Sequence, residues 1–340
     1  MKAIGYKESL PITNADSLQD IELTKPTATG NDLLIKVKAI AVNPVDYKIR
    51  QNVAPTDDNY KVIGWDAVGE VVETGNDVTR FNIGDTVFYA GDLLRQGSNA
   101  EFQLVDEKLV GLKPKNISDA EAAALPLTSI TAWEMLFEHL AIKQQASNPA
   151  QKDEVILVVG AAGGVGSILI QLAKKLTNAT IIATASRESS KQWVTDLGAD
   201  YVVDHSKPLS PQIEALNIGP LTHVASLNNT DAYIDTYVEQ LIPFGKIALI
   251  DDPEAIDIKK LKMKSLSLHW TFMYTRSMFQ TDDMVEQGKL LNRVSELIDQ
   301  GKIKTTIGKN LGKINAENLR AAHQELESGS SIGKIVLSGF

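Results

Sequence analysis

The stretch Val155–Gly166 reads VILVVGAAGGVG and decides how the second half of this chain folds. Five apolar, mostly β-branched residues run into a glycine-rich turn, and an uncharged helical pattern opens at Val165. A strand, a tight turn and a helix in this order are typical of a dinucleotide-binding βαβ unit, in which a pyrophosphate lies at the helix N-terminus. The motif alone is weak, because the first glycine of G-x-G-x-x-G is replaced by Ala161. We predict that four backbone N–H groups bind the pyrophosphate: those of Gly163, Gly164, Val165 and Gly166.

The same region raises a membrane alternative, because no charged residue occurs between Val155 and Ala173. Such a length is enough to span a bilayer. Four glycines in its middle and the soluble-type pattern on both sides favour a strand followed by a buried helix instead.

The choice of cofactor is indicated by the residues after the next apolar run, Thr180–Ala185. An NAD-selective site usually carries an acid at the end of this strand, which hydrogen-bonds the ribose 2′-hydroxyl. This chain has Ser186 and Arg187 there, and Lys191 follows four residues later. A small hydroxyl and two cations suit a 2′-phosphate, so we predict NADPH as the cofactor. The alternative is that both cations merely lie on the solvated start of a helix.

The composition is that of an ordinary globular protein of 340 residues, 43% hydrophobic and 23% charged. This length allows two domains with cores of their own. A net charge of −9 without a basic cluster disfavours nucleic acid and anionic membranes as partners. Residues 1–8 contain no apolar signal core, so we expect a cytoplasmic protein. The absence of cysteine excludes disulfides, thiolate metal sites, cysteine nucleophiles and iron–sulfur clusters.

The first part of the chain, residues 1–126, is mostly β-structure by its pattern. Short apolar segments with partial alternation are separated by Asn, Asp and Gly turns, a spacing that predicts a compact β barrel. The expected strands are residues 33–40, 68–73, 86–90 and 101–105. Two helices should follow, one opening at the capping box Ser118–Glu121 and one over residues 128–140.

From Val155 onward strands and helices alternate, which predicts an α/β fold with a doubly wound parallel sheet. The further strands expected are residues 180–185, 201–203, 222–226, 246–250 and 266–270. Two helices, 284–298 and 316–326, and a final strand, 334–337, should come after residue 272. The polar stretch 143–152 is expected to be a surface connection.

Three motifs together carry a family resemblance: Gly84-Asp85-Thr86-Val87, Gly163-Gly164-Val165-Gly166 and the ending Gly333-Lys334-Ile335-Val336-Leu337. With the order of β barrel, dinucleotide-binding unit and return segment, they make the chain resemble medium-chain dehydrogenases/reductases. Within that superfamily it is similar to the zinc-free quinone oxidoreductase branch, and more narrowly to the bacterial group labelled zinc-type alcohol dehydrogenase-like.

The resemblance implies a particular domain organisation and assembly. Residues 1–126 would form the first part of a GroES-like catalytic domain, which the return segment 273–340 completes. Residues 127–272 would form a Rossmann dinucleotide-binding domain. The resemblance also implies a homodimer made by pairing of sheet edges, with tetramers left open.

The metal ligands of the zinc alcohol dehydrogenases are missing from this chain. Those enzymes carry Cys-His-Thr-Asp where this chain has Asn43-Pro44-Val45-Asp46, and Gly-His-Glu where it has Gly64-Trp65-Asp66. Their third ligand, a cysteine, falls at Leu127. The three replacements cannot form a tetrahedral zinc site. We therefore predict a protein without zinc.

Without a Lewis acid an unactivated alcohol is hard to oxidise, because nothing lowers the pKa of its hydroxyl. An electrophilic acceptor is easier to reduce, since the cofactor carries the hydride. The predicted function is therefore an NADPH-dependent oxidoreductase that acts on quinones or α,β-unsaturated carbonyls. The alternative is an NADPH-binding sensor with little turnover. A lyase is a weaker rival, because the chain shows no obvious acid–base pair for that chemistry.

On the substrate side, Asn43 takes a former ligand position and can hydrogen-bond a carbonyl. Tyr47 is the nearest candidate proton donor, although water can also supply the proton. Trp65 and Leu127 are expected to wall the pocket, with pure core packing as the alternative for Trp65. The aromatic run Trp270–Tyr274 either lines the acceptor pocket or forms the subunit interface. Two nearby carboxylates are expected to hold structural hydrogen bonds: Asp46 and Asp66.

The resemblance implies further cofactor contacts. Asn228 lies where relatives contact the ribose, and His205 aligns with a position near the 2′-phosphate, a half-exposed turn histidine being the alternative. Thr131 resembles a residue that packs near the nicotinamide, with Thr128 as its competitor. Lys334 matches a basic residue that relatives direct at the pyrophosphate, and an edge-strand lysine is the alternative.

Overall fold

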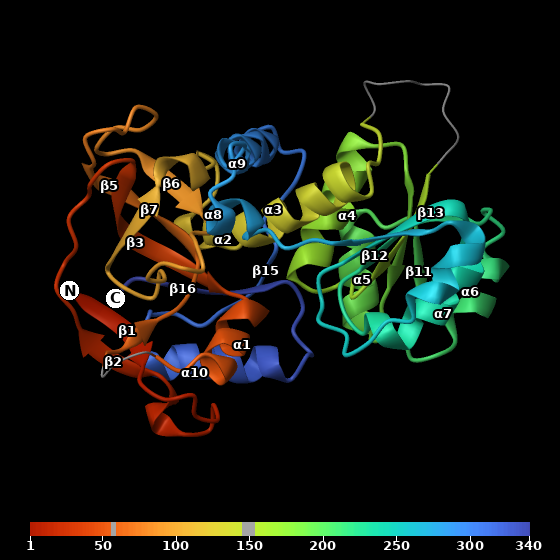
Figure 1. Ribbon diagram of the computed structural model, residues 1–340, viewed down its shortest axis with the longest axis horizontal. Helices are drawn as coiled ribbons and strands as arrows, with labels where there is room; N and C mark the ends of the chain where they lie inside the picture. Colours follow the sequence, from red (N-terminus) through yellow and green to blue (C-terminus); the bar gives the residue numbers. More distant parts are fainter. Residues whose placement is uncertain (56–58, 145–153) are drawn as a thin grey trace. The chain divides into compact units, whose positions relative to one another are not determined.

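The computed structural model describes residues 1–55, 59–144 and 154–340. Figure 1 shows its elements coloured along the chain. From residue 145 on, the predicted connection 143–152 lies outside the described residues.

The chain divides into two compact units, and the first is made of two separate stretches of sequence. Unit 1 comprises residues 1–130 and 274–340, and unit 2 comprises residues 131–273. The sequence prediction placed the two changes of domain after residues 126 and 272.

Unit 2 is built on a six-stranded parallel sheet with the strand order β11-β10-β9-β12-β13-β14. The strands are β9 (Val155–Val159), β10 (Thr180–Thr184), β11 (Tyr201–Val203), β12 (Leu221–Ser226), β13 (Leu241–Leu249) and β14 (Ser267–Trp270). Between them lie α4 (Gly164–Leu176), α5 (Glu188–Leu197), α6 (Leu209–Ala215), α7 (Thr230–Gln240) and the 3₁₀ helix η4 (Ile258–Lys264). The order runs outward from β9 in both directions, as in a doubly wound fold. The predicted α/β sheet is confirmed.

The apolar sequence of β9 is explained by its central position in this sheet. All five of its residues are buried, as expected for a parallel strand with helices on both faces. The following helix α4 buries Ile168, Leu169 and Leu172 completely. The long uncharged stretch is thus a strand and a buried helix, as predicted. Among the described residues, none of the helices has the length and apolar character needed to cross a membrane.

Unit 1 contains a seven-stranded sheet and a smaller three-stranded sheet. The larger sheet has the order β15-β16-β3-β5-β6-β8, with β7 paired to β3. Its strands are β3 (Asp32–Val42), β5 (Asp66–Thr74), β6 (Thr86–Tyr89), β7 (Phe102–Asp106), β8 (Val110–Leu112), β15 (Ile307–Asn310) and β16 (Lys334–Ser338). The smaller sheet consists of β2 (Gln19–Glu22), β1 (Lys2–Tyr6) and β4 (Lys61–Val62). Strand β16 therefore lies inside the larger sheet, between β15 and β3, and Lys334 is not an edge-strand lysine.

The helices of unit 1 are mostly those expected. They are α1 (Pro44–Asn52), α2 (Asp119–Ala123), α8 (Thr275–Phe279), α9 (Val285–Asp299) and α10 (Ala316–Glu327), with the 3₁₀ helices η1 (Ala15–Ser17) and η2 (Glu107–Leu109). Two of them, α1 and α8, were not predicted from the sequence. The signals for α1 were present, because Asn43 and Asp46 form a capping box and Pro44 occupies the first turn.

The helix predicted over residues 128–140 is present but changes type. An α-helix, α3 (Pro126–Trp133), continues as the π-helix η3 (Glu134–His139). The wider turn is visible where the Leu140 N–H donates to the Met135 carbonyl at 2.9 Å. Apolar periodicity does not separate these two helix types over so short a segment, and π-turns often occur at functional sites.

Candidate functional site

The glycine turn, residues 160–166, has the features of an anion-binding helix start. Gly160 has a left-handed φ of +76°, which glycine adopts without strain. A Cβ at Gly166 would lie 2.4 Å from the Ala161 carbonyl oxygen, so only glycine fits there. Gly163 is the N-cap of α4, and among the described residues no side chain caps this helix start. Its first backbone N–H groups therefore face outward with the partial positive charge that suits a phosphate.

The turn is fixed in place by two hydroxyl groups. The Gly160 N–H donates to Thr184 Oγ1 at the end of β10, at 3.2 Å. Ser167 Oγ donates to the Gly163 carbonyl at 2.7 Å. Neither bond uses an N–H group of the first helical turn, so the backbone is held without blocking the anion site.

The residues predicted to bind a 2′-phosphate follow β10 and include an acidic neighbour that the sequence analysis missed. Ser186 is half-buried and Arg187 is exposed. The Lys191 ammonium lies 3.8 Å from a carboxylate oxygen of Asp204. Hydrogen bonds from Ser206 hold the pKa of Asp204 below its usual value, so this acid is ionised. The signal was available: Asp204 directly follows β11, which pairs with β10, so both strand ends meet at one edge.

The other predicted cofactor residues of unit 2 occupy different settings. Asn228, exposed, follows β12 and lies against the turn: a Cβ at Gly160 would be 2.9 Å from its Oδ1. His205 is exposed, and its carbonyl oxygen accepts from the Tyr233 hydroxyl at 3.4 Å. Thr131 is buried in α3. Its competitor Thr128 belongs to unit 1, where its hydroxyl donates to the Leu125 carbonyl at 3.2 Å.

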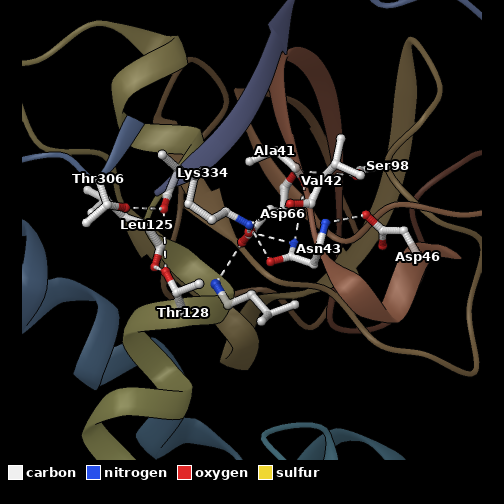
Figure 2. A network of polar contacts seen from close by, with 12 residues as sticks. Ala41, Val42, Asn43, Asp46, Asp66, Ser98, Leu125, Thr128, Thr306 and Lys334 are labelled. Carbon is white, nitrogen blue, oxygen red and sulfur yellow. Dashed lines mark hydrogen bonds and ion pairs between the residues drawn. The ribbon is translucent and has the colours of Figure 1, made fainter. Parts of the chain in front are cut away.

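A buried polar group in unit 1, which we call the Asn43 cluster, joins Asn43, Asp46, Asp66 and Lys334 (Figure 2). The Asn43 side-chain amide donates to Asp66 Oδ2 at 2.9 Å, and its oxygen accepts from the Lys334 ammonium. Lys334 also donates to the Val42 carbonyl at 2.9 Å and forms an ion pair with Asp66 at 3.0 Å. An ammonium has three N–H donors, and all three are engaged here.

The cluster leaves Asn43 little freedom. Its amide nitrogen also donates to the Ala41 carbonyl at 3.4 Å, so both amide hydrogens have acceptors. The other oxygen of Asp66 accepts from the Leu127 N–H at 2.7 Å. A substrate carbonyl can therefore receive a hydrogen bond from Asn43 only if one of these bonds gives way. The expected structural hydrogen bonds of Asp66 are present.

Asp46 combines a capping role with an unusual environment. One carboxylate oxygen accepts from the Asn43 N–H at 2.8 Å, and the other, Oδ1, is buried without a hydrogen-bond partner. Burial raises the pKa of Asp46 to about 7, against the opposing effects of the Asn43 N–H and of Lys334. Asp66 raises it further. A carboxyl group that titrates near neutrality can hold or release a proton under physiological conditions.

The apolar residues predicted around the acceptor are placed as follows. Trp65 is 1% exposed, its indole N–H donates to the Asp92 carbonyl at 2.9 Å, and its ring meets Tyr274 edge-on at 6.3 Å. Leu127 is buried as well, at 9% exposure. Tyr47 is half-buried in α1, one turn after Asn43. The core-packing alternative thus describes the surroundings of Trp65.

The aromatic run after β14 separates into exposed and buried residues. Trp270 and Phe272 are 55% and 46% exposed, whereas Met273 and Tyr274 are buried. The indole N–H of Trp270 donates to the Asp251 carbonyl at 3.0 Å. Over residues 1–55, 59–144 and 154–340, no group of three or more His, Cys, Asp or Glu side chains is arranged to hold a metal ion.

Two family models match the chain. The alcohol dehydrogenase GroES-like domain matches residues 29–115, and the zinc-binding dehydrogenase family matches residues 164–287. A zinc-type alcohol dehydrogenase-like protein of Staphylococcus aureus is 40% identical, covering 99% of this chain and 100% of its own length. The 2-methylene-furan-3-one reductase of Solanum lycopersicum is 31% identical over 99% of this chain and 79% of its own. A chloroplast envelope quinone oxidoreductase homolog of Arabidopsis thaliana is 30% identical over 95% of this chain and 94% of its own.

Solved structures agree with these sequence relatives. A candidate zinc-dependent alcohol dehydrogenase from Rhizobium etli has a TM-score of 0.96 at 52% identity, covering 100% of this chain and 98% of its own. A mycobacterial protein complexed with NADPH has a TM-score of 0.81 at 25% identity, covering 99% of each chain. The chain therefore belongs to the medium-chain dehydrogenase/reductase superfamily of oxidoreductases, with a GroES-like catalytic unit and a Rossmann-type dinucleotide-binding unit.

Proposed function

We propose that this protein is an NADPH-dependent reductase that transfers a hydride to a quinone or an α,β-unsaturated carbonyl and works without zinc. The observation that carries the proposal is the Lys334 ammonium, which is bonded to Asn43 and Asp66 in the Asn43 cluster. A positive charge is thus built into the site where related zinc enzymes carry their ligands.

The residues present do not fit a zinc ion. Trp65 and Leu127 offer no ligand atom, and the Asn43 oxygen already accepts from an ammonium. A divalent cation at this oxygen would meet the charge of Lys334 at close range, where burial weakens solvent screening. Activation of an alcohol by a metal therefore has no basis in this cluster.

The residues of unit 2 fit a nicotinamide dinucleotide phosphate. The N–H groups of residues 164–166 would hold the pyrophosphate, and that of Gly163 would join them only by giving up its bond to the Gly160 carbonyl at 3.2 Å. Ser186, Arg187, Lys191 and His205 would surround the 2′-phosphate. Asn228 would contact the ribose, and Thr131 would lie near the nicotinamide. Lys334 keeps its proposed contact with the pyrophosphate only if it gives up one of its bonds to Val42, Asn43 or Asp66. When bound, NADPH supplies a hydride to an electrophilic acceptor.

We infer the acceptor class from the missing zinc ligands and from the names of two relatives. Quinones and enones need no metal to accept a hydride, and the tomato and Arabidopsis relatives are named for such substrates. Hydride addition to either acceptor leaves an anion, which one proton neutralises. Asp46, with its raised pKa, Tyr47 and water are the candidate sources of that proton.

The test is NADPH oxidation followed with ortho- and para-quinones and with small enones, using ethanol with NADP⁺ as the negative control. We expect turnover with at least one acceptor class, none with ethanol, and no effect of a chelator. Stoichiometric zinc that is lost together with activity would contradict the proposal. Tight NADPH binding without reduction of any acceptor would instead assign the chain a sensor function.

We also propose a homodimer formed through β14, which is an edge strand of the unit 2 sheet. An edge strand presents unpaired backbone groups, and Trp270 and Phe272 add exposed aromatic surface beside it. Analytical ultracentrifugation should give a dimer for the wild type and a shift toward monomer for Trp270→Ser. A wild-type monomer at micromolar concentration would exclude this assembly.

A further inference from the structure

The loop between β12 and α7, residues 227–229, is held against the glycine turn. The Leu227 N–H donates to the carbonyl of Val159, the last residue of β9, at 3.1 Å. The next residue, Asn228, places its Oδ1 so close to Gly160 that a Cβ there would lie 2.9 Å away. Asn228 is exposed, so its amide is accessible at the edge of the turn.

This loop adopts a backbone conformation that needs support. Asn229, the N-cap of α7, has φ 51° and ψ 38°, in the left-handed region. For most L-residues that conformation is unfavourable, although Asn tolerates it better than most. Contacts from outside the loop would help to hold it.

A chain of buried hydroxyl groups provides that support. Asp251, which follows β13, accepts the Thr230 N–H at 2.8 Å and also the Thr230 hydroxyl. The hydroxyls of Ser226 and Thr230 are 2.7 Å apart, and those of Ser226 and Tyr237 are 2.8 Å apart. All three hydroxyl residues have 0% exposure.

The Asp251 carboxylate fixes which hydroxyl donates and which accepts in each hydrogen bond of this series. The Thr230 hydroxyl donates to Asp251 Oδ1, so its single proton points at that oxygen. Thr230 then accepts from Ser226, and Ser226 accepts from Tyr237. Burial raises the pKa of Tyr237, which keeps it a neutral donor. Each hydroxyl therefore has one fixed orientation, and the loop is anchored at both ends, at Ser226 and at Thr230.

We propose that this hydroxyl chain ending on Asp251 holds Asn228 in position for the ribose on the nicotinamide side of the cofactor, so that Thr230 and Asp251 are positioning residues. The proposal rests on the proposed function, because it requires a nicotinamide cofactor in unit 2. It adds two residues that touch no cofactor themselves and act through the loop. Their effect should fall on the nicotinamide half of the ligand and not on the adenosine 2′-phosphate half, which the proposed function assigns to Ser186 and Arg187.

The test compares two ligands, NADPH and 2′,5′-ADP, which contains only the adenosine half. Thr230→Val keeps the shape of the side chain and removes the hydroxyl. Loss of one hydrogen bond should raise the Kd for NADPH about 2- to 13-fold. The Kd for 2′,5′-ADP should stay within about twofold, since a change below 0.4 kcal/mol is expected there. Asp251→Asn, which replaces one of the two accepting oxygens with an amide group, should act in the same direction.

Thr222→Val is the matched control, because it is the same substitution near the start of β12, the strand whose far end leads into this loop. The Thr222 hydroxyl donates to the Val155 carbonyl at 2.9 Å and accepts the Val155 N–H at 2.8 Å. It should lower stability without changing the affinity for either ligand. Equal weakening of both ligands by Thr230→Val, or no change in either, would overturn the positioning role.

Amide hydrogen exchange in the ligand-free protein gives a second readout. Thr230→Val should speed exchange at residues 227–230, whereas Thr222→Val should not. Unchanged exchange in this loop would also overturn the proposal. Failure of the wild type to bind NADPH would instead overturn the proposed function, which is a separate result.

Discussion

The glycine turn of unit 2 and the Asn43 cluster of unit 1 use their polar groups in opposite ways. In the turn, bonds to Thr184 and from Ser167 fix the backbone without using the first N–H groups of α4. In the cluster, all three N–H donors of Lys334 and both amide hydrogens of Asn43 have acceptors within the protein. We call the glycine turn and the residues after β10 the open region, because their donors can still bond to a ligand. We call the Asn43 cluster the closed region, because its donors are bonded within the protein.

The difference follows from charge and burial. The turn carries only partial charges at a helix end, so its donors can stay available for an anion at little cost. The cluster contains a full positive and a full negative charge, and its Lys334 and Asp66 side chains are 4% and 0% exposed. Buried charges are stable only when each is paired and hydrogen-bonded. The closed arrangement is therefore what allows an ammonium to lie in the catalytic unit at all.

The largest loss of stability is expected from replacing Lys334, the cation of the closed region. Lys334→Met removes the charge that balances Asp66 and takes one donor away from the Asn43 oxygen and one from the Val42 carbonyl. Breaking a buried pair in this way costs about 3–5 kcal/mol of unfolding free energy. Urea unfolding monitored by circular dichroism measures it.

A lysine in the neighbouring strand serves as the control. Lys309 in β15 pairs with Glu325 on the surface, where its side chain is 51% exposed. Lys309→Met should change the unfolding free energy by no more than about 1 kcal/mol, because exposed pairs contribute little. Similar losses for the two variants would show that the Asn43 cluster is not specially dependent on its ammonium.

The next largest effect is a dependence of stability on pH. It arises from Asp46, whose Oδ1 atom is buried in the closed region without a hydrogen-bond partner. With a pKa raised to about 7, folded Asp46 keeps its proton at pH values where the unfolded chain has lost it. Its contribution to stability is therefore fully present below about pH 4 and is lost as the pH rises to about 7. The wild type should lose stability relative to Asp46→Asn by up to about 1.4 kcal/mol per pH unit across that range.

Asp85 offers a matched carboxylate for this measurement. It accepts the N–H of the residue three positions earlier, Asn82, at 2.8 Å, as Asp46 does from Asn43. Asp85 is half-buried, not buried, so Asp85→Asn makes the same substitution at a capping carboxylate outside the buried cluster. A pH profile for Asp46→Asn that does not differ from that of Asp85→Asn would mean that Asp46 does not act as a proton source near neutrality.

The two regions also differ in how well the sequence predicts them. The glycine turn is local: a strand, its turn and the next helix occupy consecutive residues, so their pattern is enough to place the backbone donors. The doubly wound sheet follows from the same kind of repetition. Even so, the acid beside Lys191 was missed, because Asp204 reaches it only through the pairing of β10 with β11.

The Asn43 cluster could not be derived in this way, because its members are far apart in the sequence. Asn43, Asp66 and Lys334 meet only when β16 pairs with β3 and β3 pairs with β5. The family pattern assigned Lys334 to the pyrophosphate, and no local feature indicated that it bonds to Asn43. The raised pKa of Asp46 depends on burial by these same strands and α1, which periodicity does not reveal.

A smaller effect should follow from removing one cation of the open region. Arg187→Ala takes away the exposed guanidinium proposed for the 2′-phosphate. A hydrogen bond to a charged group contributes about 1.5–3 kcal/mol, which corresponds to about 10- to 150-fold in Kd. The Kd for NADPH should rise by up to this factor while that for NADH stays nearly constant, as isothermal titration calorimetry can show. Equal wild-type affinities for the two cofactors would refute the predicted preference.

The smallest effect, and the sharpest probe of the open region, is expected from Asp204→Asn. Asp204 is ionised and lies 3.8 Å from the Lys191 ammonium, so it competes with a 2′-phosphate for that cation and repels the phosphate itself. Because the Lys191 side chain is 36% exposed, water screens the pair, and its effect should not exceed about 1 kcal/mol, or about fivefold in Kd. NADPH should bind more tightly to Asp204→Asn, and NADH should not.

A double variant, Lys191→Ala with Asp204→Asn, separates the two causes. The gain in NADPH affinity should vanish in it if the gain arises from freeing Lys191, and should persist if direct repulsion dominates. Weaker NADPH binding to Asp204→Asn would mean that the acid serves to hold Lys191 in place, and that the polar groups of the open region are also organised by partners inside the protein.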